Sequence, residues 1–165
     1  MTEVTILLVE DSRTDAALVA EALKDTSIPH RLDLVSDGEE ALRNLRGRVS
    51  KPDLILLDLN LPKLGGIEVL RLIKNDPGLR TIPVIILTNS TAPADVGAAY
   101  DNFANAYLRK PVGFDGLSAT LAKTGQFWFD TAVLPNFGRP QTSLPPPPSS
   151  APKRKASSTK IKKQK

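Results

Sequence analysis

Acidic, hydroxyl and basic side chains follow directly after four short, mostly apolar runs of this sequence. Glu10 and Asp11 follow the run VTILLV, Asp58 follows LILL, Thr88 follows VIIL, and Lys110 follows AYLR. Apolar runs of this length that end in turn residues are typical of strands buried on both faces of a parallel sheet. Because the carboxyl ends of parallel strands lie along one edge of a sheet, we expect the five side chains to converge in one crevice.

The residue types in this crevice indicate phosphoryl chemistry assisted by a metal ion. Three neighbouring carboxylates repel one another unless a cation neutralises them. Hard oxygen ligands at an open crevice suit Mg²⁺, which takes one or two protein carboxylates together with water and a phosphoryl oxygen. The Thr88 hydroxyl and the Lys110 ammonium would complete a cradle for a phosphoryl group on Asp58. Taken alone, Asp58 could instead be an ordinary turn residue at the end of a strand.

Five strands that alternate with five helices are needed to position these side chains. The pattern predicts strands over residues 4–9, 31–35, 54–57, 84–87 and 105–109. It predicts helices that begin after a Ser12 N-cap, at Asp37-Gly38 with an end at Gly47, and over 66–75, 94–100 and from about 114. This alternation predicts an α/β fold with a doubly wound five-stranded parallel sheet, in the flavodoxin-like order 2-1-3-4-5, and five flanking helices.

The charge of the chain is divided between two parts of opposite sign. Residues 1–140 carry 15 Lys and Arg against 18 Asp and Glu, a net charge of −3, whereas residues 141–165 carry +7. The second part consists mainly of Pro, Ser and Lys, so it has too little apolar surface to offset the entropy of ordering it. We expect one folded domain over 1–140, with a C-terminal aromatic extension, and a disordered basic tail over 141–165.

The basic tail is interpreted as a solvated run of charge, and specific nucleic-acid binding is not expected because the folded part is acidic. The alternative is a weak, salt-sensitive attraction of the tail to polyanions or to the membrane surface. The chain has no cysteine, no signal-peptide pattern and no apolar run long enough to span a bilayer,. We therefore expect a cytoplasmic protein. The single histidine, His30, is interpreted as a surface turn residue.

Four motifs resemble, in order and spacing, the receiver domain of two-component response regulators. They are VEDS at 9–12, LLDLNLP at 56–62, LTNS at 87–90 and YLRKP at 107–111, and the likeness extends over residues 4 to about 125. The resemblance implies that Asp58 is the phosphoacceptor. It implies that Mg²⁺ is bound by Glu10, Asp11, Asp58 and the backbone carbonyl of Asn60.

The same resemblance implies roles for residues on the far side of the crevice. Thr88 would be the switch hydroxyl, Lys110 the phosphoryl-binding lysine and Tyr107 the switch aromatic residue, and the Lys110–Pro111 bond would be cis. The signal would leave through a conformational change at the face formed by the fourth helix, the fifth strand and the fifth helix. Such a protein is not an enzyme but a phosphoacceptor that assists its own phosphorylation and dephosphorylation.

Longer stretches are similar to a narrower group, the chemotaxis-regulator-like single-domain response regulators of bacterial phytochrome histidine kinases. These stretches are VEDSRTDAALVAEALK, LLDLNLPKLGG and a late FWF followed by LP. The partner implied is a sensor histidine kinase, with a phytochrome as the candidate. A rival interpretation is a Mg²⁺-dependent phosphohydrolase with an aspartate nucleophile, but that enzyme would need a second aspartate two residues after Asp58, where this chain has Asn60.

The aromatic residues after the last predicted helix allow two interpretations. Phe127, Trp128 and Phe129, continued by Val133 and Leu134, could cover the end of their own domain. They could equally form an exposed apolar patch through which two copies of the chain associate. In the second case the sequence predicts a homodimer through the end of the fifth helix.

Overall fold

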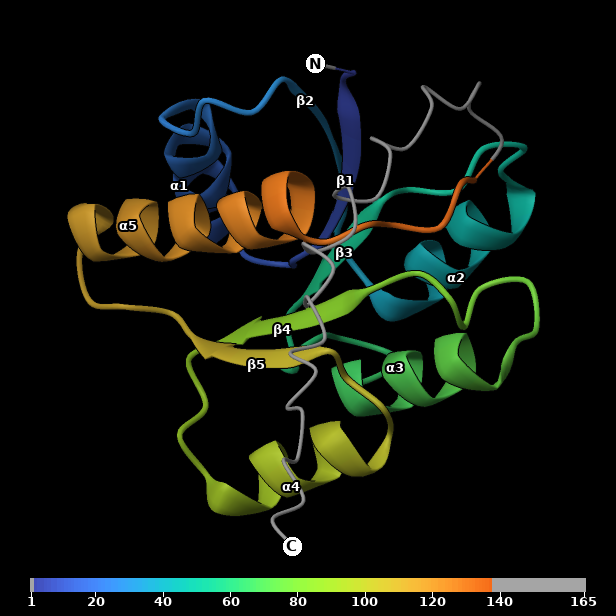
Figure 1. The fold of residues 1–165 in the computed structure, drawn as a ribbon. Coiled ribbons are helices and arrows are strands. Elements are labelled where there is room, and N and C mark those ends of the chain that lie inside the picture. Colours follow the sequence, from blue (N-terminus) through green and yellow to red (C-terminus); the bar gives the residue numbers. More distant parts are fainter. Residues whose placement is uncertain (1, 138–165) are drawn as a thin grey trace, which may run out of the picture.

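The computed structural model describes residues 2–137, which are built around a parallel sheet of five strands in the order β2-β1-β3-β4-β5 (Figure 1). The strands are β1 (Val4–Val9), β2 (His30–Val35), β3 (Leu54–Leu57), β4 (Val84–Thr88) and β5 (Ala106–Arg109). All four neighbouring pairs are parallel. The predicted fold class and strand order are confirmed.

Five α-helices cover the two faces of this sheet. They are α1 (Arg13–Lys24), α2 (Gly38–Gly47), α3 (Gly66–Asn75), α4 (Pro93–Asp101) and α5 (Phe114–Gly125). Helices α1 and α5 pack on one face, and α2, α3 and α4 pack on the other (Figure 1). The domain therefore has the three layers that an alternation of strands and helices predicts.

The central strands are buried on both faces, which explains why their sequences are continuous apolar runs. Alternate residues of β1, β3 and β4 contribute to two separate core clusters, one under each helix layer. The residues towards α1 and α5 are Ile6, Leu8, Leu54, Leu56, Ile85 and Leu87, and those towards α2, α3 and α4 are Leu7, Val9, Ile55, Leu57, Val84 and Ile86. The edge strand β2 is much less buried, and its Leu34 is 52% exposed.

Local side-chain bonds fix where the first two helices begin. The Ser12 hydroxyl accepts the backbone N–H of Asp15 at 3.2 Å, and the Asp37 carboxylate accepts that of Glu40 at 2.8 Å. Each bond satisfies an N–H that lacks a partner within its helix, so Ser12 and Asp37 act as N-caps. The cap predicted at Ser12 is confirmed.

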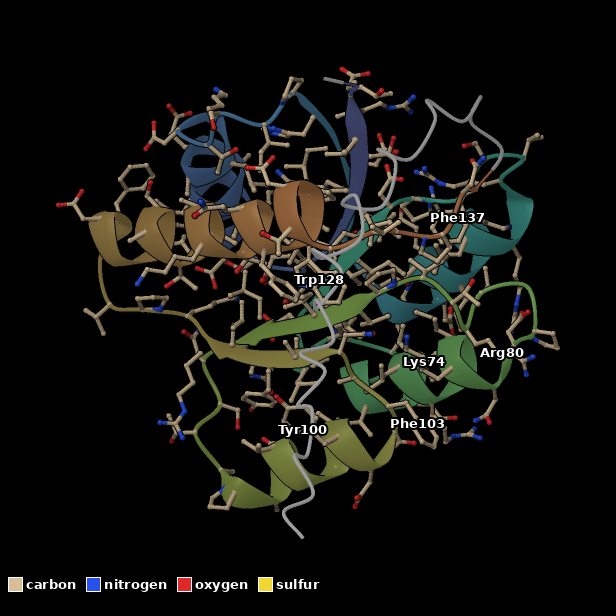
Figure 2. All side chains as sticks on the ribbon, viewed as in Figure 1. Lys74, Arg80, Tyr100, Phe103, Trp128 and Phe137 are labelled. Carbon is tan, nitrogen blue, oxygen red and sulfur yellow. The ribbon has the colours of Figure 1, made fainter. Side chains whose placement is uncertain are left out.

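The segment after α5 is a π-helical turn, η1 (Gln126–Thr131), followed by an extended stretch. Trp128 and Phe129 pack against the core cluster under α1 and α5, whereas Phe137 packs against the cluster on the opposite face. Trp128 and Phe137 mark this course, which takes the chain from one helix layer to the other (Figure 2). The first interpretation of the aromatic residues therefore holds for Trp128 and Phe129.

Three further expectations can be compared with the described residues. No peptide bond among them is cis, so the Lys110–Pro111 bond is trans and the expectation of a cis bond is wrong. An X–Pro bond favours trans by only about 0.5–1 kcal/mol, so the dipeptide does not determine its own isomer. None of the described helices is long and apolar enough to cross a membrane. The predicted tail, 141–165, lies outside the described residues.

Candidate functional site

The sheet carries Glu10, Asp11, Asp58 and Lys110 just past the ends of its strands, and Thr88 is the last residue of β4. Backbone hydrogen bonds continue beyond the strands, from Glu10 N–H to the Val35 carbonyl at 3.0 Å and from Asp58 N–H to the Val9 carbonyl at 3.1 Å. The Lys110 N–H donates in the same way to the Thr88 carbonyl at 2.8 Å. Because the backbone at these positions is fixed by the sheet, the side chains meet at its carboxyl edge, as the sequence predicts.

The Lys110 ammonium lies at the centre of the site and contacts three carboxylates. Its Nζ donates to Glu10 Oε2 at 2.6 Å, to Asp15 Oδ2 at 2.8 Å and to Asp58 Oδ2 at 2.9 Å. The Lys110 side chain is only 8% exposed. An ammonium has three N–H donors, so these carboxylates engage all of them.

Glu10, Asp11 and Asp58 form a group of carboxylates that fits a divalent metal ion. One oxygen of each lies within 4.8 Å of the others. Glu10 and Asp58 are buried, whereas Asp11 is exposed at the mouth of the crevice. A set made of hard oxygen donors that opens to solvent on one side suits an ion that retains water ligands.

The environments of the two buried acids move their pKa values in opposite directions. Burial raises the pKa of Glu10 to about 7, assisted by the negative charge of Asp58 and opposed by Lys110. Burial also disfavours the charged form of Asp58, but hydrogen bonds from Lys110 and the Asn60 N–H outweigh it, so the pKa of Asp58 is lowered. Burial alone would lower the pKa of Lys110, yet the three carboxylates raise it above its ordinary value. Asp58 is therefore ionised at neutral pH, as a nucleophile must be.

Asp58 is held at both of its carboxylate oxygens. Oδ2 accepts the Lys110 bond, and Oδ1 accepts the backbone N–H of Asn60 at 3.1 Å. In this structure Asn60 thus contributes a backbone N–H donor to the Asp58 carboxylate. Metal binding by the Asn60 carbonyl stays a prediction.

Thr88 and Tyr107 are both linked to one residue of the β4–α4 loop, Ser90. The buried Thr88 hydroxyl accepts the Ser90 N–H at 3.4 Å, and the Tyr107 hydroxyl donates to the Ser90 carbonyl at 3.1 Å. The Ser90 hydroxyl in turn donates to Asp95 in the first turn of α4. A continuous set of hydrogen bonds therefore joins the crevice to α4 and β5.

Two residues of the site, Asp15 and Ser90, were missed by reasoning from the sequence. Asp15 lies three residues after the Ser12 N-cap, in the first turn of α1, and this helix begins directly after Glu10 and Asp11. That spacing was the available signal. Ser90 is an ordinary serine in a loop, and nothing in its type or spacing distinguishes it.

Comparison with known proteins finds many similar sequences. The family model of the response regulator receiver domain matches residues 6–122. Response regulator Rcp1 of Synechocystis sp. is 44% identical over 135 residues, which are 79% of this chain and 92% of Rcp1.

Two solved structures show the same similarity in three dimensions. The phosphorylated cyanobacterial phytochrome response regulator RcpA gives a TM-score of 0.78 at 42% identity, covering 82% of this chain and 100% of RcpA. The Mn²⁺-bound form of Rcp1 gives a TM-score of 0.75 at 43% identity, covering 81% of this chain and 99% of Rcp1. The similarity therefore extends over the sheet and the crevice at its carboxyl edge.

Proposed function

This chain belongs to the response regulator receiver domain family and acts as a phosphoacceptor in two-component signalling, and from this premise we propose that Asp58 is the residue that accepts the phosphoryl group. The observation that carries the proposal is the state of the Asp58 carboxylate. It is buried, both of its oxygens are held by donors, and these donors lower its pKa. The phosphohydrolase alternative is not favoured, because the amide of Asn60 cannot act as a general acid.

The residues of the crevice have separate roles in phosphoryl transfer. An Asp58 oxygen forms a bond to phosphorus while the bond from phosphorus to the imidazole nitrogen of the donor histidine breaks, and that nitrogen keeps the electron pair. Mg²⁺ held by Glu10, Asp11, Asp58 and the Asn60 carbonyl would neutralise charge on the phosphoryl oxygens. Lys110 donates to a phosphoryl oxygen from its place beside Asp58, so the chain assists its own phosphorylation.

The output of the switch follows from the bonds around Ser90. A phosphoryl oxygen on Asp58 recruits the Thr88 hydroxyl, which then leaves the Ser90 N–H. Because Tyr107 is bonded to the Ser90 carbonyl, the loop and the Tyr107 ring rearrange together. We place the resulting change at the face formed by α4, β5 and α5. This is a shift between two packings that a local change of charge drives.

The proposed donor is a sensor histidine kinase, and we place the transfer to this chain in the cytoplasm. The name of one similar protein, the cyanobacterial phytochrome response regulator RcpA, supports a kinase of the phytochrome type.

We also propose that two copies associate through the end of α5. Phe127 is 52% exposed and Val133 is 77% exposed, which supports an apolar contact there, while Trp128 and Phe129 pack on their own domain.

Labelling with acetyl phosphate tests the assignment of Asp58. We expect the wild-type chain to gain one phosphoryl group in the presence of Mg²⁺ and none in excess chelator, measured by intact-protein mass spectrometry. Asp58→Asn removes the nucleophile and should abolish the gain, whereas Asp130→Asn, an exposed acid on η1, should not change it. Undiminished labelling of Asp58→Asn would refute the assignment.

A further inference from the structure

Asp15 is the member of the Lys110 contacts for which the proposed chemistry has no role. Its carboxylate lies 2.8 Å from the Lys110 Nζ, as close as the two acids that belong to the proposed metal site. Its side chain is 30% exposed, whereas those of Glu10 and Asp58 are almost fully buried. It comes from a different element, the first turn of α1.

The backbone of Asp15 is fixed independently of Lys110. Its N–H donates to the Ser12 hydroxyl in the N-cap of α1, and α1 packs against the sheet through Ala16 and Val19. The Asp15 carboxylate is therefore presented from a rigid helix end. A lysine side chain, in contrast, is a flexible four-carbon stem whose ammonium takes its position from its partners.

The three carboxylates around Lys110 differ in what phosphorylation does to them. Asp58 gives up its negative charge on becoming an acyl phosphate, and Glu10 is a member of the carboxylate group that fits the metal ion. Asp15 is outside that group and is not the acceptor. It is thus the one partner of Lys110 whose charge stays committed to the ammonium throughout the cycle.

We propose that Asp15 is a positioning residue that keeps the Lys110 ammonium beside Asp58, so that the other two N–H donors of Lys110 are free to turn to the phosphoryl oxygens. The proposal rests on the function proposed above and extends it by one residue. Without Asp15, Lys110 would reach the transition state with no fixed partner. Loss of such positioning lowers the rate of transfer.

The first test compares labelling rates at saturating acetyl phosphate and Mg²⁺. Asp15→Asn should slow the labelling of Asp58 about tenfold, because the ammonium loses a charged hydrogen-bond partner; a tenfold change in rate corresponds to about 1.4 kcal/mol. Glu21→Gln is the matched control, because it removes one negative charge from the same helix. Glu21 lies away from the crevice and pairs with Lys24. Equal rates for Asp15→Asn and Glu21→Gln would overturn the proposal.

The second test asks whether Asp15 acts through Lys110. In metal-free protein, the NMR signal of the Lys110 side-chain ammonium should shift in Asp15→Asn and not in Glu21→Gln. In urea unfolding, Asp15→Asn combined with Lys110→Met should destabilise by less than the sum of the two single changes, because both remove the same contact. An unshifted ammonium signal, or strictly additive effects, would overturn the proposal even if labelling were slowed.

The two hypotheses fail in different ways. A wild-type chain that gains no phosphoryl group on Asp58 would contradict the proposed function. A wild-type chain that is labelled normally, with Asp15→Asn labelled at the same rate, would leave that function intact and contradict the role of Asp15 alone.

Discussion

At the scale of single residues, the crevice is a balance of buried charges with Lys110 as the internal counter-ion. One ammonium faces three carboxylates, and Asp11 adds a fourth acid at the mouth. The excess of negative charge is what gives the site its affinity for a divalent cation. Burial of Glu10, assisted by the negative charge of Asp58, raises its pKa, and this has a measurable consequence for folding.

Without metal, stability should decrease as the pH rises through the pKa of Glu10. That pKa is about 7 in the folded protein and 4.5 in the unfolded reference, so the folded state binds the proton more tightly. The stabilisation is fully present below about pH 4.5, declines as the pH rises to about 7, and is on the order of 3 kcal/mol. The lowered pKa of Asp58 acts in a separate, more acidic range. Urea unfolding in chelator should show this decline in the wild type and not in Glu10→Gln; equal slopes would contradict it.

Thr88→Ala should separate phosphorylation from signalling. The substitution removes the hydroxyl but none of the carboxylates or the ammonium, so Asp58 should still be labelled, within about tenfold of the wild-type rate. The Tyr107 ring should no longer respond, because its link to the crevice runs through the bond between Thr88 and Ser90. Ring resonances of Tyr107, recorded by NMR before and after labelling, provide the measurement. A ring that shifts as in the wild type would show that Thr88 does not couple the site to β5.

At the scale of elements, periodicity and turn residues were enough to predict the five strands and the five α-helices, because the central strands are buried on both faces and the helices pack on the sheet through apolar residues. The ends of these elements were predicted less accurately. Helix α4 was expected to stop at 100 but runs to Asp101, and Phe103 closes it with a φ of 64°, a conformation usually left to glycine,. The π-helical turn depends on how Trp128 and Phe129 pack against the core.

Asp15 and Ser90 belong to the site through tertiary contacts, which the local sequence around each residue does not encode.

Two glycines in helices should respond oppositely to alanine. At Gly66 a Cβ would overlap the Asp58 carbonyl and lie 2.6 Å from Leu59 Cα. The start of α3 can therefore lie this close to Asp58 and Leu59 only if residue 66 is glycine. Gly66→Ala should destabilise by about 1–3 kcal/mol, as overpacking does, and slow labelling by displacing Asp58. At Gly97 a Cβ meets nothing within 4 Å, so Gly97→Ala should stabilise by about 0.5–1 kcal/mol through helix propensity,. Urea unfolding of both variants measures the contrast, and a stabilised Gly66→Ala would contradict the packing argument.

At the scale of the whole molecule, the chain continues to pack on the core beyond its fifth helix. Residues 126–137 carry Trp128 and Phe129 to the core under α1 and α5, and Phe137 to the core on the other face. This segment therefore ties the two helix layers together across the sheet. The sequence indicated a boundary at 140 because composition changes there, and the packing of Phe137 gives a physical reason for the domain to include this stretch.

Two truncations should distinguish the packed extension from the basic tail. Ending the chain after Arg139 removes Pro140 and the tail 141–165, which the sequence predicts to be disordered, so the melting temperature and the labelling rate should match the full chain. Ending it after Gly125 also removes three aromatic side chains that cover the core, and the loss should be several kcal/mol, at about 1.5–3 kcal/mol for each side chain when fully buried,. Thermal unfolding at two salt concentrations measures the stability of both truncated chains.

The +7 charge is carried by the tail, so any attraction to anionic vesicles should vanish with either truncation and weaken with salt,. A chain ending at Arg139 that unfolds or is no longer labelled would show that the tail is part of the fold.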